Sequence, residues 1–403
     1  MQRKRLPREL VVFLVLSIVF TALSLLHAGI LSLRHHNWLG FSLLWPPGPG
    51  FDFYAHLERM RLLHSSSFFT YPGYQWYYPA PAVIVYWLLY LFCFGGHWQW
   101  GFVIYAAVIL TGCLFFSRRF DAALAQRGIR PRTARDFTSI TLLTSWPLFI
   151  SLQRGNLEGI LWLVLAVAIW AIVKDRWMLA AIILGLAAAV KIYPVLCFAL
   201  FLRGRRWKEI AAGLFAMGCV TLFALRFMEP NVLEAMHHVS KGVGAFTYDY
   251  ALLGWQAQMV YDHSCFELIK IFSSPFHLAF APLVHRYMAI MAVAMSLIFF
   301  ARVLWLPKVN QVLFLIIACL FLPPASFDYT LQSLYIPFAW IVLVFVSDPK
   351  ANKSWSMITT ILFAVETAPL TFLSLHGLSI AGAVKGVVTC PRKSRPIKAG
   401  VLS

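Results

Sequence analysis

The sequence alternates between apolar runs and short polar breaks over most of its length. Many of the runs approach or reach the about 20 residues that a helix needs to cross the hydrocarbon core of a bilayer. Backbone groups inside a bilayer must be hydrogen-bonded within the protein, which favours helices. We therefore predict an all-α polytopic membrane protein with about 11–12 transmembrane helices. The apolar runs cover residues 10–33, 79–94, 99–116, 137–152, 157–173, 177–190, 193–202, 209–228, 277–301, 310–323, 331–347 and 355–375, with a weaker run at 376–390.

Two neighbouring runs, 177–190 and 193–202, are too short for a full crossing unless the bilayer is locally thin or the runs are half-helices. Half-helices joined by irregular backbone are tolerated at membrane depth only where they line a cavity. The junction Lys191-Ile192-Tyr193-Pro194 between them therefore points to a hydrated site near the outer surface.

The composition excludes several classes of protein. Hydrophobic residues make up 60% of the chain and charged residues only 12%, whereas about 25% of the residues of a soluble domain are charged. These values exclude a soluble globular enzyme, a disordered protein and a secreted disulfide scaffold. The seven cysteines are odd in number, form no CxxC pair and lie mostly in apolar runs, so we interpret them as small apolar residues. The run 10–33 is long enough to remain as the first span rather than act as a cleaved signal.

The positive charge indicates how the chain is oriented. Lys and Arg exceed Asp and Glu by 34 to 16, and 24 of those 34 cations fall into clusters between the apolar runs. The positive-inside rule assigns such clusters to the cytoplasm, which places the N-terminus inside. We expect a multi-pass protein of the cell inner (plasma) membrane. The clusters lie at residues 3–8, 118–135, 174–176, 203–208, 302–308, 350–353 and 392–398.

Counting the crossings identifies one apolar run that does not span the membrane. If both 79–94 and 99–116 crossed, the arginine-rich loop 117–135 would lie outside, against the positive-inside rule. The run 79–94 starts with Pro79-Ala80-Pro81 and ends at Gly95-Gly96, so we predict that it lies at the outer interface or dips in and returns. Every cluster up to Lys353 is then cytoplasmic. The tail also lies inside only if 376–390 crosses.

An acidic residue in the first outer loop is the leading catalytic candidate. Asp52 follows a Pro/Gly-rich stretch and precedes a helical pattern, where it could simply cap a helix N-terminus. It could also be a carboxylate at the mouth of an outward cavity that accepts a proton from an acceptor hydroxyl. The spacing alone leaves both interpretations open.

Four polar side chains interrupt the apolar sequence at 153–159, the first of them Gln153. Arg154, Asn156 and Glu158 lie in this break together with two glycines, and a tight turn that caps the next helix would explain the glycines. An arginine and an amide at membrane depth are costly, which favours a binding role instead. Lys191 also has a structural and a functional interpretation. Its side chain could snorkel to the headgroups, or its ammonium could act as a point charge on a phosphate.

The outer breaks also carry an acid and several tyrosines. Asp328 and Tyr329 follow Pro323-Pro324 and precede the run 331–347, so Asp328 could cap that helix or orient a substrate or a cation. Tyr78 and Tyr193 lie at two other breaks. Interfacial aromatic belts explain most such residues, and sugar stacking would also use them.

The sequence does not support other kinds of site. The histidines of the large outer loop form no HExxH pair and are loosely spaced, so we expect no metal. GxxxxGK[ST] and GxGxxG are both missing, so we expect no nucleotide cofactor. No nucleic-acid-binding module is recognisable.

A series of short motifs, taken in order, resembles a known family. The most specific of them is Gly-Leu-Ala-x-x-x-Lys-x-x-Pro at 185–194. The series comprises Asp52-Phe53-Tyr54, Tyr77-Tyr78-Pro79, Gly155-Asn156, the stretch 185–194, the basic stretch 202–207 and the late turn 324–327. Together they resemble glycosyltransferase family 87, a group of GT-C membrane transferases, over most of residues 1–345.

The resemblance implies a GT-C fold and a lipid-linked sugar donor. The fold would place a conserved seven-helix module at 1–228, with juxtamembrane helices in the outer loop 34–98. A large outer loop at 229–276 and variable C-terminal helices with a basic tail at 277–403 would follow. The donor would be a polyprenyl-phosphate hexose, typically mannose, and the acceptor a lipid or glycan on the extracytoplasmic side.

The resemblance also assigns roles to residues. In such inverting transferases the acid of the first outer loop is the general base, which is Asp52 by position. Lys191 and Arg154 match best as the cations that stabilise the leaving lipid phosphate. The late turn departs from the family pattern, because Asp328-Tyr329 stands where mannosyltransferase members often carry a histidine. That departure bears on the identity of sugar and acceptor.

Two other classes of function remain as alternatives. A secondary transporter or a flippase of lipid-linked saccharides would also have broken helices and charges at depth. Such proteins usually show two related halves, and the sequence contains no second copy of the 185–194 motif. A structural subunit of an envelope-assembly complex is the third possibility.

Overall fold

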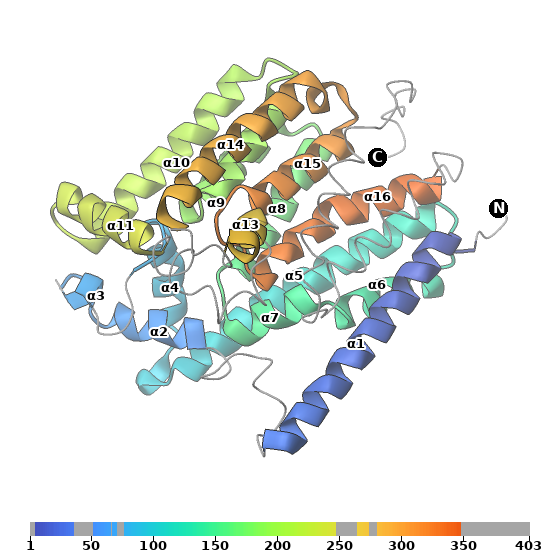
Figure 1. Ribbon diagram of the computed structural model, residues 1–403, viewed down its shortest axis with the longest axis horizontal. Coiled ribbons are helices and arrows are strands. Elements are labelled where there is room, and N and C mark those ends of the chain that lie inside the picture. The colour runs from blue at the N-terminus through green and yellow to red at the C-terminus, as the bar shows by residue number, and fades with distance from the viewer. Residues whose placement is uncertain are drawn as a thin grey trace.

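The computed structural model in Figure 1 describes residues 5–35, 51–65, 67–70, 76–246, 264–273 and 280–347. Within these residues every regular element is helical, and no strand is present. The order of elements is α1 (Arg8–His35), α2 (Phe51–Met60), α3 (Ser67–Thr70), α4 (Ala82–Tyr90), η2 (Phe94–Gly96), α5 (Trp98–Gln126), α6 (Pro131–Leu143), α7 (Trp146–Arg154), α8 (Glu158–Val173), α9 (Trp177–Val190), η3 (Tyr193–Phe201), α10 (Trp207–Met228), α11 (Val232–Phe246), α13 (Cys265–Ser273), α14 (Phe280–Ala301), η7 (Val303–Trp305), α15 (Lys308–Phe321), η8 (Asp328–Leu334) and α16 (Tyr335–Ser347).

The helices confirm an all-α polytopic membrane protein. Among the described residues, four helical segments are long and apolar enough to cross a membrane: Trp98–Gln126, Trp207–Met228, Pro282–Trp305 and Tyr329–Ser347. Three shorter apolar helices, α8, α9 and α15, accompany them. The runs predicted at 355–375 and 376–390 lie outside the described residues, so the number of crossings stays a prediction.

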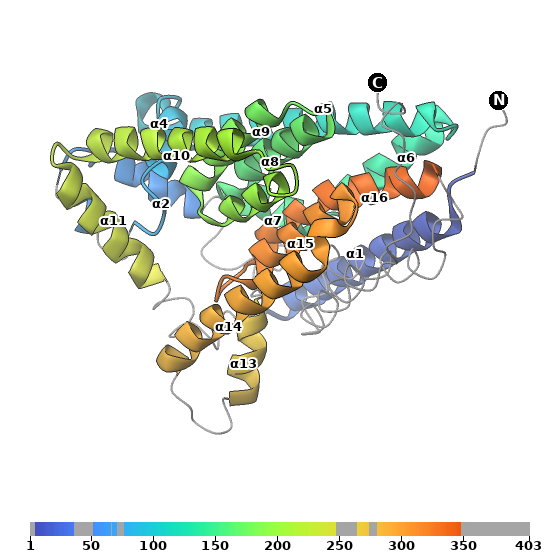
Figure 2. The same cartoon turned by 90° about the horizontal axis from the view of Figure 1, so that it is seen from above.

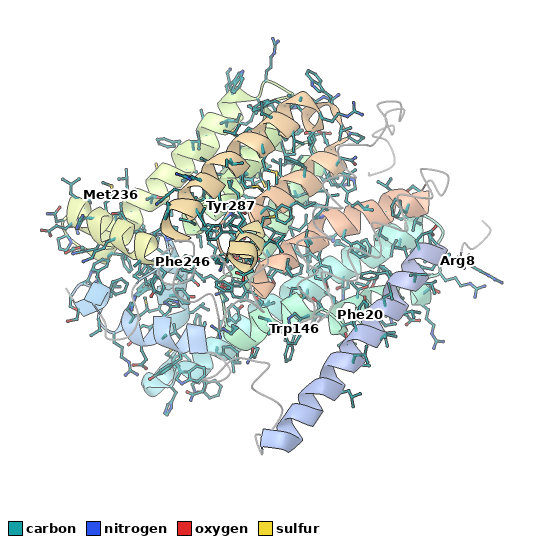
Figure 3. The ribbon with its side chains drawn as sticks, in the orientation of Figure 1. Arg8, Phe20, Trp146, Met236, Phe246 and Tyr287 are labelled. Atoms are coloured by element: carbon teal, nitrogen blue, oxygen red, sulfur yellow. The ribbon has the colours of Figure 1, made fainter. Side chains whose placement is uncertain are left out.

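The long helices run between two ends of different character. Short helices α2, α3, α4 and α11 gather at one end, whereas the start of α1, the α5–α6 turn and the end of α16 lie at the other (Figures 1 and 2). Figure 3 shows Arg8 and Met236 at these opposite ends. A hydrogen bond from Arg127 Nε to Ser347 Oγ of 2.9 Å joins the α5–α6 turn to the end of α16. Basic segments that are distant in sequence therefore share one end, which agrees with the charge pattern.

The segment 79–94 forms no membrane-spanning helix. Its helix α4 has only nine residues, about 14 Å at 1.5 Å per residue, against a hydrocarbon core of about 30 Å. Pro81 stands at the N-cap of α4, and the 3-10 turn η2 follows at the other end. Its buried face, which includes Tyr86 and Leu89, packs inward. This confirms that α4 is too short to cross, as the crossing count predicted.

The apolar run 137–152 is two helices rather than one. The helix α6 ends at Leu143, and α7 begins at Trp146. Between them Ser145 takes the N-cap position, and its Oγ accepts a hydrogen bond of 3.2 Å from the backbone N–H of Leu148. Pro147 follows within the first turn of α7, a position where its missing N–H does no harm.

The two short runs are confirmed as short helices separated by a break. The helix α9 has 14 residues and the 3-10 helix η3 has nine, which correspond to about 21 Å and about 18 Å. Each is shorter than the hydrocarbon core of about 30 Å. Lys191 is the extended C-cap residue of α9, so the break lies where the sequence placed it.

Glycines allow α9 and α10 to pack closely. A Cβ added to Gly185 would collide with the backbone carbonyl of Gly213, and a Cβ on Gly213 would lie 2.5 Å from the carbonyl of Ala181. The glycine of the 185–194 motif therefore permits the approach of two backbones.

The N-terminal and C-terminal helices share one core. Phe13 of α1 packs against Phe338 of α16 with ring centroids 4.7 Å apart. The same buried cluster contains Leu184 of α9 and Ile316 of α15. The division at 228 and 276 therefore stays a prediction about sequence segments, which in space contribute to one helical body.

Candidate active site

Three interruptions of the helices supply the polar side chains of the candidate site. The first is the break between α7 and α8, the second is the break between α9 and η3, and the third is the start of η8. We call the residues that they bring together, with one from the segment before α4, the Glu158 cluster. Its members are Tyr78, Asn156, Glu158, Lys191, Tyr193 and Tyr329.

A buried ion pair lies at the centre of the Glu158 cluster. The side chain of Glu158 is 0% exposed, and its Oε2 lies 2.6 Å from Nζ of Lys191. The hydroxyl of Tyr193 donates to the other carboxylate oxygen, Oε1. Removing a carboxylate from water is costly unless it is paired and hydrogen-bonded, and these two donors provide that compensation.

Two aromatic rings flank the ammonium group of Lys191. Its Nζ lies 5.6 Å from the ring centroid of Tyr78 and 5.4 Å from that of Tyr329. Both distances are within the range of cation–π attraction. The Lys191 side chain keeps 17% of its surface exposed. It is therefore the charged member of the ion pair that a ligand can reach.

Asn156 connects the α7–α8 break to the Glu158 cluster. Its Oδ1 accepts a hydrogen bond of 3.1 Å from the backbone N–H of Glu158, which caps the first turn of α8. Its Nδ2 donates to the hydroxyl of Tyr78 over 3.2 Å. Its backbone carbonyl accepts from the hydroxyl of Tyr105 over 2.7 Å. The break is therefore both a helix cap, as the turn interpretation expected, and part of the cluster.

The helix α2 lies directly beside this break. Gly155 has φ +69°, and a Cβ on it would lie 2.5 Å from Cβ of Phe53. The ring of His56, one turn further along α2, lies 5.1 Å from the ring of Tyr78. Position 52 precedes His56 by four residues, so both positions share a face of α2.

Two of the predicted site residues, Asp52 and Asp328, are placed only by their backbone. The helix α2 begins at Phe51, so Asp52 lies in its first turn rather than before it. Asp328 is the first residue of η8. The side chains of both acids fall outside the described part of the structure, so their roles stay predictions. Arg154 is the last residue of α7, beside the break, and is half-buried.

His56 was missed by the sequence analysis. Burial, reinforced by the neighbouring Arg59, lowers the pKa of His56 to about 3, so the imidazole is neutral at physiological pH. Among the residues that the structure describes, its Nδ1 has no hydrogen-bond partner. The available signal was the spacing from Asp52, since residues four apart share a helix face. Tyr105, inside an apolar run, carried no such signal.

The described residues include no group of three or more His, Cys, Asp or Glu side chains arranged to hold a metal ion. The polar chemistry of the Glu158 cluster is supplied by one carboxylate, one ammonium, one amide and three phenols.

Comparison with known proteins gives one family. Residues 76–323 match the model of Glycosyltransferase family 87. The chain is 34% identical over 137 residues to a polyprenol-phosphate-mannose-dependent alpha-(1-2)-phosphatidylinositol pentamannoside mannosyltransferase of Mycolicibacterium smegmatis. This match covers 33% of this chain and 30% of that protein. The chain is also 37% identical over 92 residues to GPI mannosyltransferase 1 of Gibberella zeae, and this match covers 23% of this chain and 20% of that protein. The matched segments thus span less than a third of either relative.

Proposed function

The chain belongs to glycosyltransferase family 87, and on that premise we propose that it is an integral membrane glycosyltransferase. It moves a hexose, most naturally mannose, from a polyprenyl-phosphate donor to an acceptor hydroxyl on the extracytoplasmic face. The observation that carries the proposal is the Glu158 cluster, where a reachable ammonium and two tyrosine rings converge at breaks between membrane helices. The mannose dependence named for one relative and the mannosyltransferase name of another support the choice of sugar.

Lys191 serves as the phosphate-binding cation in this proposal. The phosphate of the donor gains charge as the glycosidic bond breaks, and a fixed cation stabilises that charge most where water is excluded. Glu158 lies 2.6 Å from the ammonium of Lys191 and neutralises it. The donor phosphate approaches the exposed part of Lys191, while the fully buried Glu158 holds the ammonium from behind. Arg154, at the adjoining break, supplies a second positive charge.

Asp52 is the proposed general base, and the reaction inverts the anomeric centre. The oxygen of the acceptor hydroxyl forms a bond to the anomeric carbon from the face opposite the phosphate. The bond between that carbon and the phosphate oxygen breaks, and its electron pair leaves with the lipid phosphate. The proton of the hydroxyl passes to the Asp52 carboxylate. The position of Asp52, one turn before His56, supports this role because His56 contacts Tyr78 of the cluster.

Aromatic and amide groups orient the sugar. The rings of Tyr78 and Tyr329 offer apolar faces on either side of Lys191, as sugar stacking requires. Asn156 fixes the hydroxyl of Tyr78 through its amide. Asp328 precedes Tyr329 and is proposed to orient the acceptor or the sugar hydroxyls.

The test is transfer of radiolabelled mannose from polyprenyl-phosphate-mannose in membranes that contain the wild-type protein or a variant. General bases contribute about 10²–10⁴-fold to rate, so Asp52→Asn should lose activity on that scale. Glu58→Gln is the matched control, because Glu58 is another acid of α2 but pairs with Arg61 at 3.1 Å. Wild-type activity in Asp52→Asn would refute the assignment of the base. Movement of the lipid-linked sugar across the bilayer without transfer would point to a flippase.

A further inference from the structure

Three basic turns that are far apart in sequence meet at the end of the molecule opposite the Glu158 cluster. They connect α8 to α9, η3 to α10, and α14 to α15. We call their cations the basic platform. It comprises Lys174, Arg176, Arg203, Arg205, Arg206, Lys208, Arg302 and Lys308, and the same turns carry only the acids Asp175 and Glu209.

Side-chain contacts hold the turns of the platform together. Nζ of Lys308 lies 3.1 Å from Oδ1 of Asp175, which joins the start of α15 to the α8–α9 turn. The ring of Trp177 has the guanidinium of Arg206 4.3 Å from its centroid and Nζ of Lys308 4.7 Å from it. A further bond of 3.2 Å runs from Arg203 Nη1 to the carbonyl of Leu306 in the third turn. The cations are therefore concentrated on one surface.

Tryptophans mark the depth of this surface in the membrane. Trp207 is 60% exposed at the start of α10, and Trp305 is 54% exposed in η7. Tryptophan is enriched at the level of the lipid headgroups, where its ring is apolar and its N–H is wet. Lys174, Arg176 and Arg205 are also exposed on these turns. Exposed cations beside exposed tryptophans lie at the level of lipid phosphates.

Arg205 of the platform has a left-handed backbone conformation, which is unfavourable for arginine. Arg205 has φ +50°, in the left-handed region, and Asp175 occupies the matching place in the α8–α9 turn with φ +56°. Aspartate tolerates this region through local hydrogen bonds, whereas glycine is the residue that a left-handed turn normally selects over arginine. Such backbone strain is typical of functional positions. Arg205 is therefore a candidate functional position of the platform.

We propose that the basic platform is a binding site for anionic phospholipid headgroups. The ligand is a phosphodiester with net negative charge. Its phosphate is bound by the exposed cations of the platform, Lys174, Arg176 and Arg205, because Arg206 and Lys308 are paired with Glu209 and Asp175, while its acyl chains lie along the exposed apolar surface of α9 and α10. This site lies on the face that the positive-inside rule assigns to the cytoplasm, away from the Glu158 cluster. It is independent of the proposed transferase chemistry. General attraction between basic segments and anionic lipid would depend equally on every exposed cation at this end, whereas a site depends on the cations of the platform.

The proposal predicts selective lipid binding by the purified full-length protein. The probes are phosphatidylglycerol and the zwitterionic phosphatidylcholine, titrated into detergent solution and counted as adducts by native mass spectrometry. Each cation near an anionic lipid contributes about 1 kcal/mol, so removing one should weaken binding about fivefold. Wild-type protein should prefer phosphatidylglycerol, and that preference should fall as ionic strength rises.

The informative variant is Arg205→Gly. Glycine accepts the left-handed conformation at this position, so the variant keeps its unfolding temperature while it loses a cation. Phosphatidylglycerol binding should fall about fivefold and phosphatidylcholine binding should not change. Arg135→Gln is the matched control, because Arg135 is an exposed cation of α6 in another basic segment at the same end. The control should bind both lipids as the wild type does.

Three results would overturn the proposal. Equal binding of the two lipids by the wild type would show that the platform has no charge selectivity. Wild-type binding by Arg205→Gly would show that the exposed cations of the platform do not bind the headgroup. An equal loss in Arg135→Gln would mean that the total charge of this end matters and the platform does not.

Discussion

The ion pair of Glu158 and Lys191 allows a quantitative prediction, because its two partners differ in exposure. Glu158 is fully buried and Lys191 keeps 17% of its side-chain surface exposed. In Lys191→Met, the carboxylate stays buried and loses the ammonium, while the hydroxyl of Tyr193 still donates to it. Leaving one charge of a buried pair uncompensated costs about 3–5 kcal/mol in folding free energy.

The reverse substitution should cost less. In Glu158→Gln, an amide oxygen still accepts from Tyr193, and the ammonium of Lys191 reaches water through its exposed surface. Losing a hydrogen bond to a charged group costs about 1.5–3 kcal/mol. The double variant Lys191→Met/Glu158→Gln has no unpaired charge, so it should be more stable than Lys191→Met alone.

The assay is thermal unfolding of the four proteins in one detergent at neutral pH, followed by the loss of monodisperse protein after heating. The expected order of stability is wild type first, then Glu158→Gln, with Lys191→Met last and the double variant above Lys191→Met. Equal losses in the two single variants would contradict the burial argument. Additive losses in the double variant would show that the two side chains are not coupled.

Three further predictions concern other parts of the molecule. Gly185→Ala should lower the free energy of unfolding by about 1–3 kcal/mol, because the added Cβ collides with a backbone carbonyl of α10. Gly218→Ala is the control, since Gly218 lies on α10 with open space around it, and this variant should unfold at or above the wild-type temperature. The low pKa of His56, about 3, means that the unfolded chain binds more protons below pH 6.5, so stability should fall by about 1.4 kcal/mol per pH unit from pH 6.5 towards pH 4.5. The unfolding temperature of His56→Phe should depend less on pH over this range than that of the wild type. An unchanged dependence would contradict the low pKa of His56. Cys197 of η3 and Cys319 of α15 are both buried, so N-ethylmaleimide should modify these thiols only after the protein is denatured. Peptide mass spectrometry checks this, and modification in the folded protein would contradict their burial.

Much of the candidate site was predictable because polar residues are rare in this chain. Arg154, Asn156, Glu158 and Lys191 interrupt apolar runs, and a polar side chain at membrane depth is costly unless it has a partner or a role. Such positions therefore stand out without knowledge of the fold. The short length of α4 was predictable for a similar reason, since the positive-inside rule constrains the parity of crossings.

The pairing of those residues was not predictable. Glu158 and Lys191 are 33 positions apart, and other cations beside breaks, such as Arg154, were equally plausible partners in the sequence. The approach of Phe53 to Gly155 likewise depends on how α2 packs beside α7. His56 was overlooked because its burial, and hence its low pKa, arises from rings contributed by other segments.

The amino-acid sequence by itself determined the helical class, the breaks that carry the candidate site, and the gathering of cations at one end, but not the break between α6 and α7. These follow from the transfer of single side chains and of backbone groups between water and lipid, which depends on residue type and local order. Only the tertiary structure decided that Glu158 neutralises Lys191 between Tyr78 and Tyr329, and that three basic turns close around Trp177. The physical reason is that ion pairs and cation–π contacts act over a few ångströms, so helix packing alone selects which costly residues become partners.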